Sequence, residues 1–330
     1  MSDVIALATE LLSVESTTGR ERDAVEFVSR WLIARGWDVT LQEVETGRSN
    51  VWATRRGGGV TLSTHLDTVP PFVPPRLDGD RLYGRGACDA KGIAAAMMIA
   101  AENLSAAGEE RVDLLFVVGE EKGSPGARAA NRLPATSRFL INGEPTESKL
   151  ASGAKGAQRV IVRVRGREAH SAYAHLGRSA LDPLLEMLPE LRHLQLPMDA
   201  VLGATTYNIG VLRAGTEANI VPGLAEAEIM IRLVGDVVPV KEAFGRWAGD
   251  RAELVWGSHI PAQHFHLIDG FDVEAVAYTS DIPLLDRWGT PLLFGPGSIH
   301  VAHTPIEYIN VAELEASVSA YEQLVRALLA

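Results

Sequence analysis

The first 155 residues alternate between helical and strand-like patterns of apolar positions. Spacings of three or four residues predict helices at 4–12, behind Asp3 as N-cap, and at 20–35, 92–107 and 124–131. Short β-branched runs between turn residues predict strands at 37–44, 50–55, 60–64, 112–118 and 138–141. Strands that alternate with helices of this length favour an α/β fold, with a mostly parallel central sheet covered by helices on both faces.

The pattern changes near residue 156. Residues 157–166 alternate apolar and basic side chains, as a half-exposed antiparallel strand does, and we expect this strand at an exposed edge. The segments that follow predict a small α+β, ferredoxin-like domain: a helix at 178–194, strands at 204–213 and 224–234, and a helix at 239–249. A strand at 292–294 and an amphipathic helix at 311–329 resume the first pattern. We therefore predict a larger domain of residues 1–155 and 263–330, interrupted by an inserted domain of residues 156–262.

Composition narrows the classes of function. The chain has 31 Lys and Arg against 42 Asp and Glu, a net charge of −11, which argues against nucleic acid as a partner. Its single cysteine, Cys88, excludes an intramolecular disulfide, and no run of about 18 apolar residues predicts a membrane span. The first twelve residues lack the basic region and cleavage site of a signal peptide, so we expect a cytoplasmic protein.

Acidic and histidine residues follow four of the strand-like runs or the loops beside them. Each motif alone is as common in a solvated turn or a helix cap, but ligand sites of α/β sheets lie beyond the carboxyl ends of strands. Their convergence there favours a site. The residues concerned are His65 and Asp67, Asp89, Glu120 and Glu121, and Glu144.

Imidazole and carboxylate donors suit zinc, cobalt or manganese. His65, Asp89, Glu121 and Glu144 supply four donors, of which one carboxylate can bridge two metals. A fifth donor is His300 or His303; we favour His303, with Glu307 as an outer acceptor for its ring.

The glycine-rich loop Gly84-x-Gly86-x-x-Asp89 also invites a dinucleotide-binding interpretation. The third glycine of that fingerprint is an aspartate here, and its charge would oppose a pyrophosphate. A nucleotide-dependent oxidoreductase is therefore disfavoured.

Seven stretches, in order along nearly the whole chain, resemble one metallopeptidase superfamily: STHLDTVP, GRGACDAKG, VVGEEKGS, INGEPT, GREAHSAYAHLGRSA, EANIVPGLAEAEIMIRL and FGPGSIHVAHTPIEYI. This superfamily includes acetylornithine deacetylase, succinyl-diaminopimelate desuccinylase, aminoacylase and the glutamate-releasing carboxypeptidases. The chain is most similar to the acetylornithine deacetylase-like members. The resemblance implies a catalytic metal-binding domain and, in residues 156–262, a lid and dimerisation domain.

The resemblance also implies roles for individual residues. Two divalent ions, Zn²⁺ or else Co²⁺ or Mn²⁺, would be held by His65 and Glu144 and by Glu121 and His303, with Asp89 bridging and the Asp89–Ala90 peptide cis. Asp67 would orient His65, Glu120 would act as the general base, and His170 would stabilise the oxyanion from across a homodimer. The implied substrate-binding residues are Asn219, Arg232, Lys155 and Thr279.

The expected reaction is hydrolysis of the amide bond of an N-acyl amino acid, first of all N-acetylornithine. The alternatives are a desuccinylase, or a carboxypeptidase or dipeptidase that releases lysine or ornithine from a peptide or an acidic carrier protein. Tyr278 stands where many relatives have glycine, which makes the desuccinylase less secure. A catalytically silent binding module would normally have lost a ligand or the base, and this chain retains all six positions.

Overall fold

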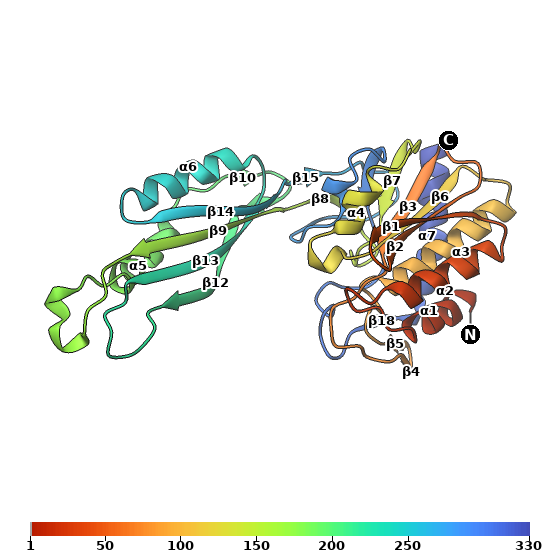
Figure 1. Ribbon diagram of the computed structural model, residues 1–330. Helices are drawn as coiled ribbons and strands as arrows, with labels where there is room; N and C mark the ends of the chain where they lie inside the picture. Colours follow the sequence, from red (N-terminus) through yellow and green to blue (C-terminus); the bar gives the residue numbers. More distant parts are fainter. Residues whose placement is uncertain (1) are drawn as a thin grey trace. The chain divides into compact units, whose positions relative to one another are not determined.

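The chain forms two compact units in a computed structural model that describes residues 2–330 (Figure 1). Unit 1 contains the chain up to Ser152, then Phe265–Glu274 and Ser280–Ala330. Unit 2 contains Gly153–His264 and the short return Ala275–Thr279. The sequence placed the boundaries at 155/156 and 262/263, a few residues away, and did not foresee the return.

Unit 1 is built on a six-stranded mixed sheet of order β1-β2-β6-β3-β7-β17. Strands β6, β3, β7 and β17 run parallel, whereas β1 and β2 form an antiparallel hairpin that joins β6. This arrangement confirms the predicted α/β class. The strands are β1 (Asp38–Glu45), β2 (Arg48–Thr54), β3 (Val60–His65), β6 (Val112–Val117), β7 (Phe139–Asn142) and β17 (Thr290–Leu293).

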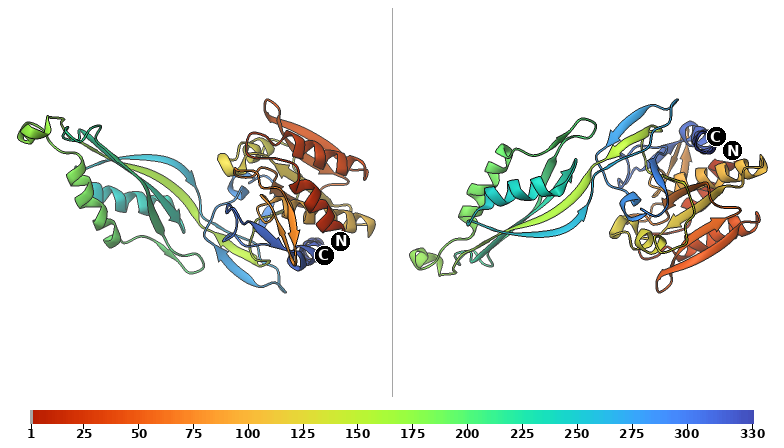
Figure 2. Two further views of the ribbon diagram at one scale, coloured as in Figure 1. Left: turned by 90° about the horizontal axis from the view of Figure 1, so that it is seen from below. Right: turned by 90° about the horizontal axis from the view of Figure 1, so that it is seen from above.

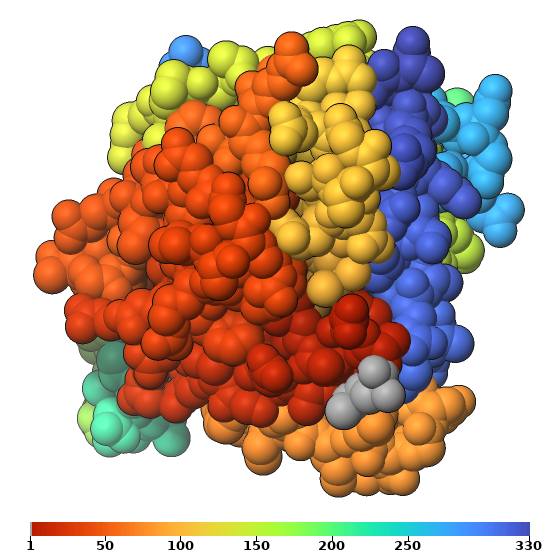
Figure 3. Space-filling model, turned by 90° about the vertical axis from the view of Figure 1, so that its right-hand side faces the viewer, coloured from red at the N-terminus to blue at the C-terminus, as the bar shows by residue number. Residues whose placement is uncertain are grey.

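Alternate residues of β6 pack into two cores, one on each face of this sheet. Leu114 and Phe116 belong to the large core, which helices α1, α2, α3 and α7 cover. Leu115 and Val117 face the other way, into a smaller core with Trp288 that α4 covers. Figure 3 shows α3 and α7 side by side on the outside of this unit. The helices are α1 (Asp3–Leu12), α2 (Arg22–Ile33), α3 (Lys91–Ala106), α4 (Pro125–Ala130) and α7 (Val311–Leu329).

Small differences from the predicted elements have local causes. Ser2, and not Asp3, occupies the N-cap position of α1, so Asp3 is the first helical residue. A three-stranded sheet escaped prediction because its strands are only three residues long: β4 (Arg76–Asp78), β5 (Arg81–Tyr83) and β18 (Tyr308–Asn310). None of the helices within residues 2–330 combines the length and the apolar character needed to cross a membrane.

Unit 2 is a four-stranded antiparallel sheet of order β12-β13-β9-β14, with α5 and α6 on one face. Figure 2 shows the two helices side by side, and Trp247 of α6 donates to the carbonyl of Met187 at the end of α5. The order of strands and helices is that of the predicted ferredoxin-like domain. The elements are β9 (Gly156–Arg165), α5 (Leu181–Met187), β12 (Thr206–Ala214), β13 (Leu224–Leu233), α6 (Val237–Ala248) and β14 (Glu253–Ile260).

Two expectations for this unit are wrong. Strand β9 lies inside the sheet, between β13 and β14, so residues 157–166 are not an edge. The helix expected at 178–194 is α-helical only as far as Met187 and continues as the 3-10 helix η3 (Leu188–His193). Pro189 near the start of η3 has no N–H to donate to the preceding turn.

The remaining short strands are β8 (Leu150–Ala154), β15 (Gln263–His264), β16 (Val273–Val276) and the pair β10 (Met198–Asp199) and β11 (Gly203–Ala204).

Candidate metal centre

Four parallel strands of unit 1 deliver polar side chains to one edge of the sheet. His65 is the last residue of β3, and Glu144 follows β7. Glu120 and Glu121 begin the 3-10 turn η1 (Glu120–Lys122) after β6, and His303 lies in the loop after β17. The carboxyl ends of parallel strands share an edge, so these side chains meet, as the sequence predicted.

Asp89 lies at the centre of the group, in the loop before α3. Its Oδ1 is 2.9 Å from Nε2 of His65, and its Oδ2 is 3.2 Å from Nε2 of His303. Nε2 of His303 also lies 2.9 Å from Oε1 of Glu121. The buried Asp89 carboxylate thus contacts two histidines, each with a different oxygen. The exposed His300 makes no such contact among the described residues, and the peptide between Asp89 and Ala90 is cis.

The tautomer of His65 follows from its second nitrogen. Nδ1 lies 2.8 Å from the backbone carbonyl of Asp67, and a carbonyl only accepts, so Nδ1 donates the proton. Nε2, which lies against Asp89, is therefore the nitrogen that would bind a cation once its own proton is lost. The Asp67 carboxylate, which we expected to orient this ring, is farther away, with Oδ1 at 3.6 Å from Nδ1.

The Asp67 carboxylate instead holds the turn that carries the two glutamates. Its Oδ1 accepts from the backbone N–H of Gly119 at 2.8 Å and of Glu120 at 3.0 Å, and its Oδ2 accepts from that of Glu121 at 3.2 Å. The Thr18 hydroxyl, which the sequence did not single out, donates to Oδ2 at 2.9 Å. Asp67 therefore orients His65 through its backbone and η1 through its side chain.

The buried acids of the group are electrostatically crowded. Burial, followed by the charges of Glu120 and Asp89, raises the pKa of Glu144 well above its usual value, and Oε1 of Glu144 has no hydrogen-bond partner within residues 2–330. Burial, followed by the charge of Asp281, likewise raises the pKa of Glu120. The pKa of Asp281 itself is raised to about 6 by burial. Asp281 could not be predicted as part of this group, because nothing in a Thr-Ser-Asp run indicates which side chain is buried.

The pKa values of the two histidines are raised as well, which for an imidazole favours the charged form. Hydrogen bonds to Asp89 and Glu121 raise the pKa of His303 to about 10. Burial opposes the charged form of His65, but hydrogen bonds and nearby acids outweigh it and raise its pKa. Carboxylates outnumber cationic groups at this edge, which leaves unbalanced negative charge.

These residues fit a metal. One donor atom each from His65, Asp89 and Glu121 lies within 4.8 Å of the others. Glu144 adds an unpartnered buried oxygen, and His303 contacts two of the acids. A divalent cation would offset the negative charge and give these oxygens a partner.

Glu307 does not serve His303, contrary to our expectation. Its carboxylate accepts from the Arg85 guanidinium at 2.6 Å and from backbone amides of the loop that carries Asp89. Because Arg85 and these amides bind the carboxylate, the sequence proximity of Glu307 to His303 was misleading.

The five remaining predicted residues lie in unit 2, at two ends of its sheet. His170 forms a bridge with Ile220, and the N–H of Ser171 donates to the carbonyl of Asn219, so His170 and Asn219 are neighbours. Arg232 pairs with Ala157 at the opposite end of β13. It follows Leu224, the first residue of β13, by eight residues, which is roughly 26 Å at about 3.3 Å per residue. Lys155 precedes β9 at that end, and its Nζ donates to the carbonyl of Ala204 at 2.6 Å. Its N–H donates to the carbonyl of Val276, three residues before Thr279.

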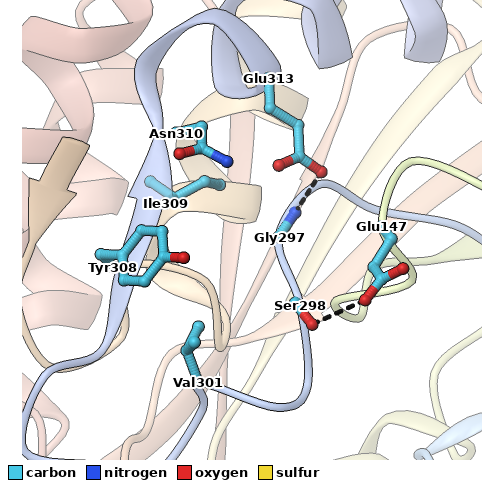
Figure 4. Close-up of a pocket in the computed structure, with 8 residues that line it drawn as sticks. All are labelled: Glu147, Gly297, Ser298, Val301, Tyr308, Ile309, Asn310 and Glu313. Atoms are coloured by element: carbon cyan, nitrogen blue, oxygen red, sulfur yellow. Dashed lines mark hydrogen bonds between the residues drawn. The ribbon is translucent and has the colours of Figure 1, made fainter. Parts of the chain in front are cut away.

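A separate surface pocket of about 340 Å³ lies along the loop that leads to His303 (Figure 4). Glu313 accepts from the N–H of Gly297, and the Ser298 hydroxyl donates to Glu147 across its rim. None of its lining residues is one of the predicted ligands.

Both the sequence and the fold of this chain are similar to those of known peptidases. The sequence profile of peptidase family M20/M25/M40 matches residues 61–327. A probable carboxypeptidase of Aspergillus clavatus is 38% identical over 375 residues, which cover 99% of this chain and 83% of that one. The aminopeptidase PepT of Bacillus cereus has the same fold, with a TM-score of 0.82, 21% identity, and coverage of 99% and 98% of the two chains. The YXEP protein of Bacillus subtilis, described as a dinuclear metal-binding peptidase, superposes with a TM-score of 0.74 at 17% identity and covers 99% and 98%.

Proposed function

This chain belongs to peptidase family M20/M25/M40 and is a hydrolase of that metallopeptidase family, and on that premise we propose that it is a carboxypeptidase or dipeptidase. The name of the Aspergillus clavatus relative supports this substrate class, because its 38% identity extends over nearly the whole chain. Deacetylation of N-acetylornithine, our first expectation, cleaves the same kind of bond but receives no support from these names. The expected similarity to acetylornithine deacetylase-like members likewise receives no support, because this relative is named a carboxypeptidase.

The proposed centre holds two divalent cations, with Zn²⁺ first and Co²⁺ or Mn²⁺ as alternatives. His65 and Glu144 would hold one, Glu121 and His303 the other, and Asp89 would bridge them. The observation that carries this proposal is the placement of the two Asp89 oxygens, one on each histidine. When bound, such cations polarise an amide carbonyl and acidify water.

Glu120 is the proposed general base. It begins the turn that Asp67 holds, and burial beside Asp281 raises its pKa, which favours proton uptake at its carboxylate. In the proposed reaction this carboxylate takes a proton from the attacking water and returns it to the nitrogen of the departing amine. The acid thus acts twice and ends unchanged.

The substrate-binding roles of unit 2 remain part of the proposal. Arg232, half-buried on β13, offers a planar fork for the free carboxylate of a peptide, and Lys155 and Thr279 lie toward the same end of the sheet. His170 and Asn219 lie at the other end, roughly 26 Å away at about 3.3 Å per strand residue. One small ligand does not span that distance, so we propose a homodimer through residues 156–262 in which each copy completes the other's site.

Mixing inactive variants tests this division. Glu120→Gln and His170→Ala copies, dissociated and re-associated together, form mixed dimers with one intact site out of two. About a quarter of wild-type activity is then expected from statistical mixing. No recovery, with mixed dimers demonstrated by mass spectrometry, would show that His170 does not act across the interface.

The function itself is tested with a substrate panel and the Glu120→Gln variant. An N-blocked dipeptide with a free carboxyl terminus should be cleaved, and its carboxyl-terminal amide should not. N-acetylornithine, N-succinyl-diaminopimelate and lysine linked to an acidic carrier protein complete the panel. Glu120→Gln should bind cobalt yet lose turnover by at least about a hundredfold, whereas Glu110→Gln, on the exposed surface, should match wild type. Cleavage only of the acylated amino acids would overturn the peptidase proposal.

A further inference from the structure

We propose that Glu307 is the positioning residue for Asp89: its carboxylate fixes the loop that aims the two Asp89 oxygens at the two histidines. The inference rests on the proposed metal-dependent hydrolysis, since it assigns a cause to the geometry of that centre. Glu307 is not itself among the group of potential ligands within residues 2–330.

The contacts of Glu307 are concentrated on this one loop. Oε1 accepts from the backbone N–H of Gly86 at 2.9 Å, of Cys88 at 3.3 Å and of Asp89 at 3.3 Å. Oε2 accepts from the Arg85 guanidinium at 2.6 Å. Four of the five residues 85–89, all except Ala87, therefore donate to a single carboxylate.

The loop depends on this acceptor because it is buried and belongs to no sheet. Gly86 has a φ of 89°, and a Cβ there would lie 2.9 Å from both Thr68 and Lys91, so the backbone runs against packed side chains. Water has little access, since Glu307, Arg85 and Asp89 are each at most 5% exposed. A buried amide without a partner is strongly disfavoured, so loss of the carboxylate should make the loop rearrange.

Arg85 makes this arrangement compatible with a neighbouring metal centre. It balances the charge of Glu307 on the side away from the amides, so that Glu307 is not a free anion that competes with Asp89 for cations. The carboxylate then acts on the loop through its backbone amides and through the Cys88 thiol, whose Sγ lies 3.7 Å from Oε1.

Glu307 also connects the segment that carries His303 with the loop that carries Asp89. It follows His303 by four residues and immediately precedes β18, which pairs with β5 just before the Asp89 loop. The N–H of Gly84 donates to the carbonyl of Glu307, which adds a backbone contact to the side-chain contacts. The segment that carries His303 therefore also positions Asp89, the acid that His303 contacts.

Asp67 plays the same part for the turn that carries Glu120 and Glu121. Its buried carboxylate accepts from the backbone N–H groups of residues 119–121. Both anchors touch backbone N–H groups of a loop whose side chains form the centre. The test must separate such positioning from a simple structural ion pair.

Two double variants make that separation. Arg85→Met with Glu307→Gln keeps a carbonyl oxygen for the amides, whereas Arg85→Met with Glu307→Met removes it, and neither leaves a buried unpaired charge. We expect the Gln variant to keep the visible absorption spectrum of bound Co²⁺ and its affinity within about threefold. The Met variant should change that spectrum and bind Co²⁺ about 10–100-fold more weakly. Its kcat should fall with little change in KM.

Controls make each result decisive. Arg55→Met with Glu102→Met removes another half-buried pair of unit 1 and should leave the cobalt spectrum unchanged, even if the melting temperature falls. If the Met variant does not fold, Glu307→Asp, which keeps the charge but shortens the side chain, should still shift the spectrum. A folded Met or Asp variant with wild-type spectrum and cobalt affinity would overturn the proposal.

The outcome for the wild type separates this inference from the proposed function. A wild type that binds cobalt but hydrolyses no peptide would overturn the function and leave the positioning role measurable by spectrum. A wild type that binds no cobalt would overturn both.

Discussion

Replacement of Asp113 by asparagine should stabilise the protein above pH 6 and not near pH 4. Asp113 lies in β6, in register with Thr61 of β3, and is 2% exposed. Its Oδ1 has no hydrogen-bond partner within residues 2–330. Burial raises the pKa of its carboxyl from 3.8 to about 6.

The size and direction of the effect follow from that pKa. Between about pH 4 and 6 the folded chain holds a proton that the unfolded chain has lost, so stability falls as pH rises through this interval. At about 1.4 kcal/mol per pKa unit, the full loss is about 3 kcal/mol above pH 6. Asparagine does not ionise, so Asp113→Asn avoids this loss. About 3 kcal/mol is a ceiling, because the new amide also needs partners.

Urea unfolding from pH 4 to 7, followed by tryptophan fluorescence, measures this. The difference in unfolding free energy between Asp113→Asn and wild type should grow in favour of the variant by up to about 3 kcal/mol over this range. Asp38→Asn, on the exposed strand β1, should show no comparable trend. A difference that stays constant from pH 4 to 7 would refute the raised pKa.

Four further outcomes follow from the same structure. Gly126→Ala should lower the unfolding free energy by about 1–3 kcal/mol in urea titrations, because its Cβ would lie 2.3 Å from the carbonyl oxygen of Val118. Gly245→Ala, inside α6 with open space around its Cβ, should instead raise it by about 0.5–1 kcal/mol. Chelation should lower the melting temperature, and zinc or cobalt at a hundredfold excess over its Kd should restore about 2.7 kcal/mol; an unchanged melting curve would argue against a resident metal. Asp67→Asn should fold yet lose activity about 10–100-fold, since one oxygen no longer accepts from Glu121 and Thr18; wild-type kcat in a folded variant would contradict this.

The convergence of the site could be read from the chain because it depends on strand direction. Parallel strands end at one edge, so a polar residue after each apolar run predicts a meeting point even when no contact is known. His65, Glu121 and Glu144 were found in this way, and the loop before α3 added Asp89. Helix α7 could be predicted at 311–329 because its apolar residues repeat at helical spacing and pack against one core.

The partners of individual side chains could not be read in this way. Asp67 and Glu307 bind backbone amides, and an amide carries no mark in the sequence of whether it is already paired. Proximity along the chain suggested His65 for Asp67 and His303 for Glu307, but the amides of two other loops take both carboxylates. Residues 157–166 were wrongly expected at an edge for a similar reason. Strand β14, which pairs with them, begins almost 90 residues later in the sequence.

Charge and geometry at this centre are thus assigned to different residues. Burial, followed by repulsion from neighbouring acids, raises the pKa values of Glu120 and Glu144, so the proximity of these two side chains to Asp89 is electrostatically unfavourable. Asp67 and Glu307 hold the loops of Glu120 and Asp89 chiefly through backbone amides, and each also accepts from a side chain, Thr18 or Arg85. Removal of Glu307 together with Arg85 therefore alters the orientation of the donors at nearly constant local charge, whereas a change at Glu144 alters the charge itself. Spectrum and affinity for a cation should respond differently to the two kinds of variant, which makes the division of labour measurable.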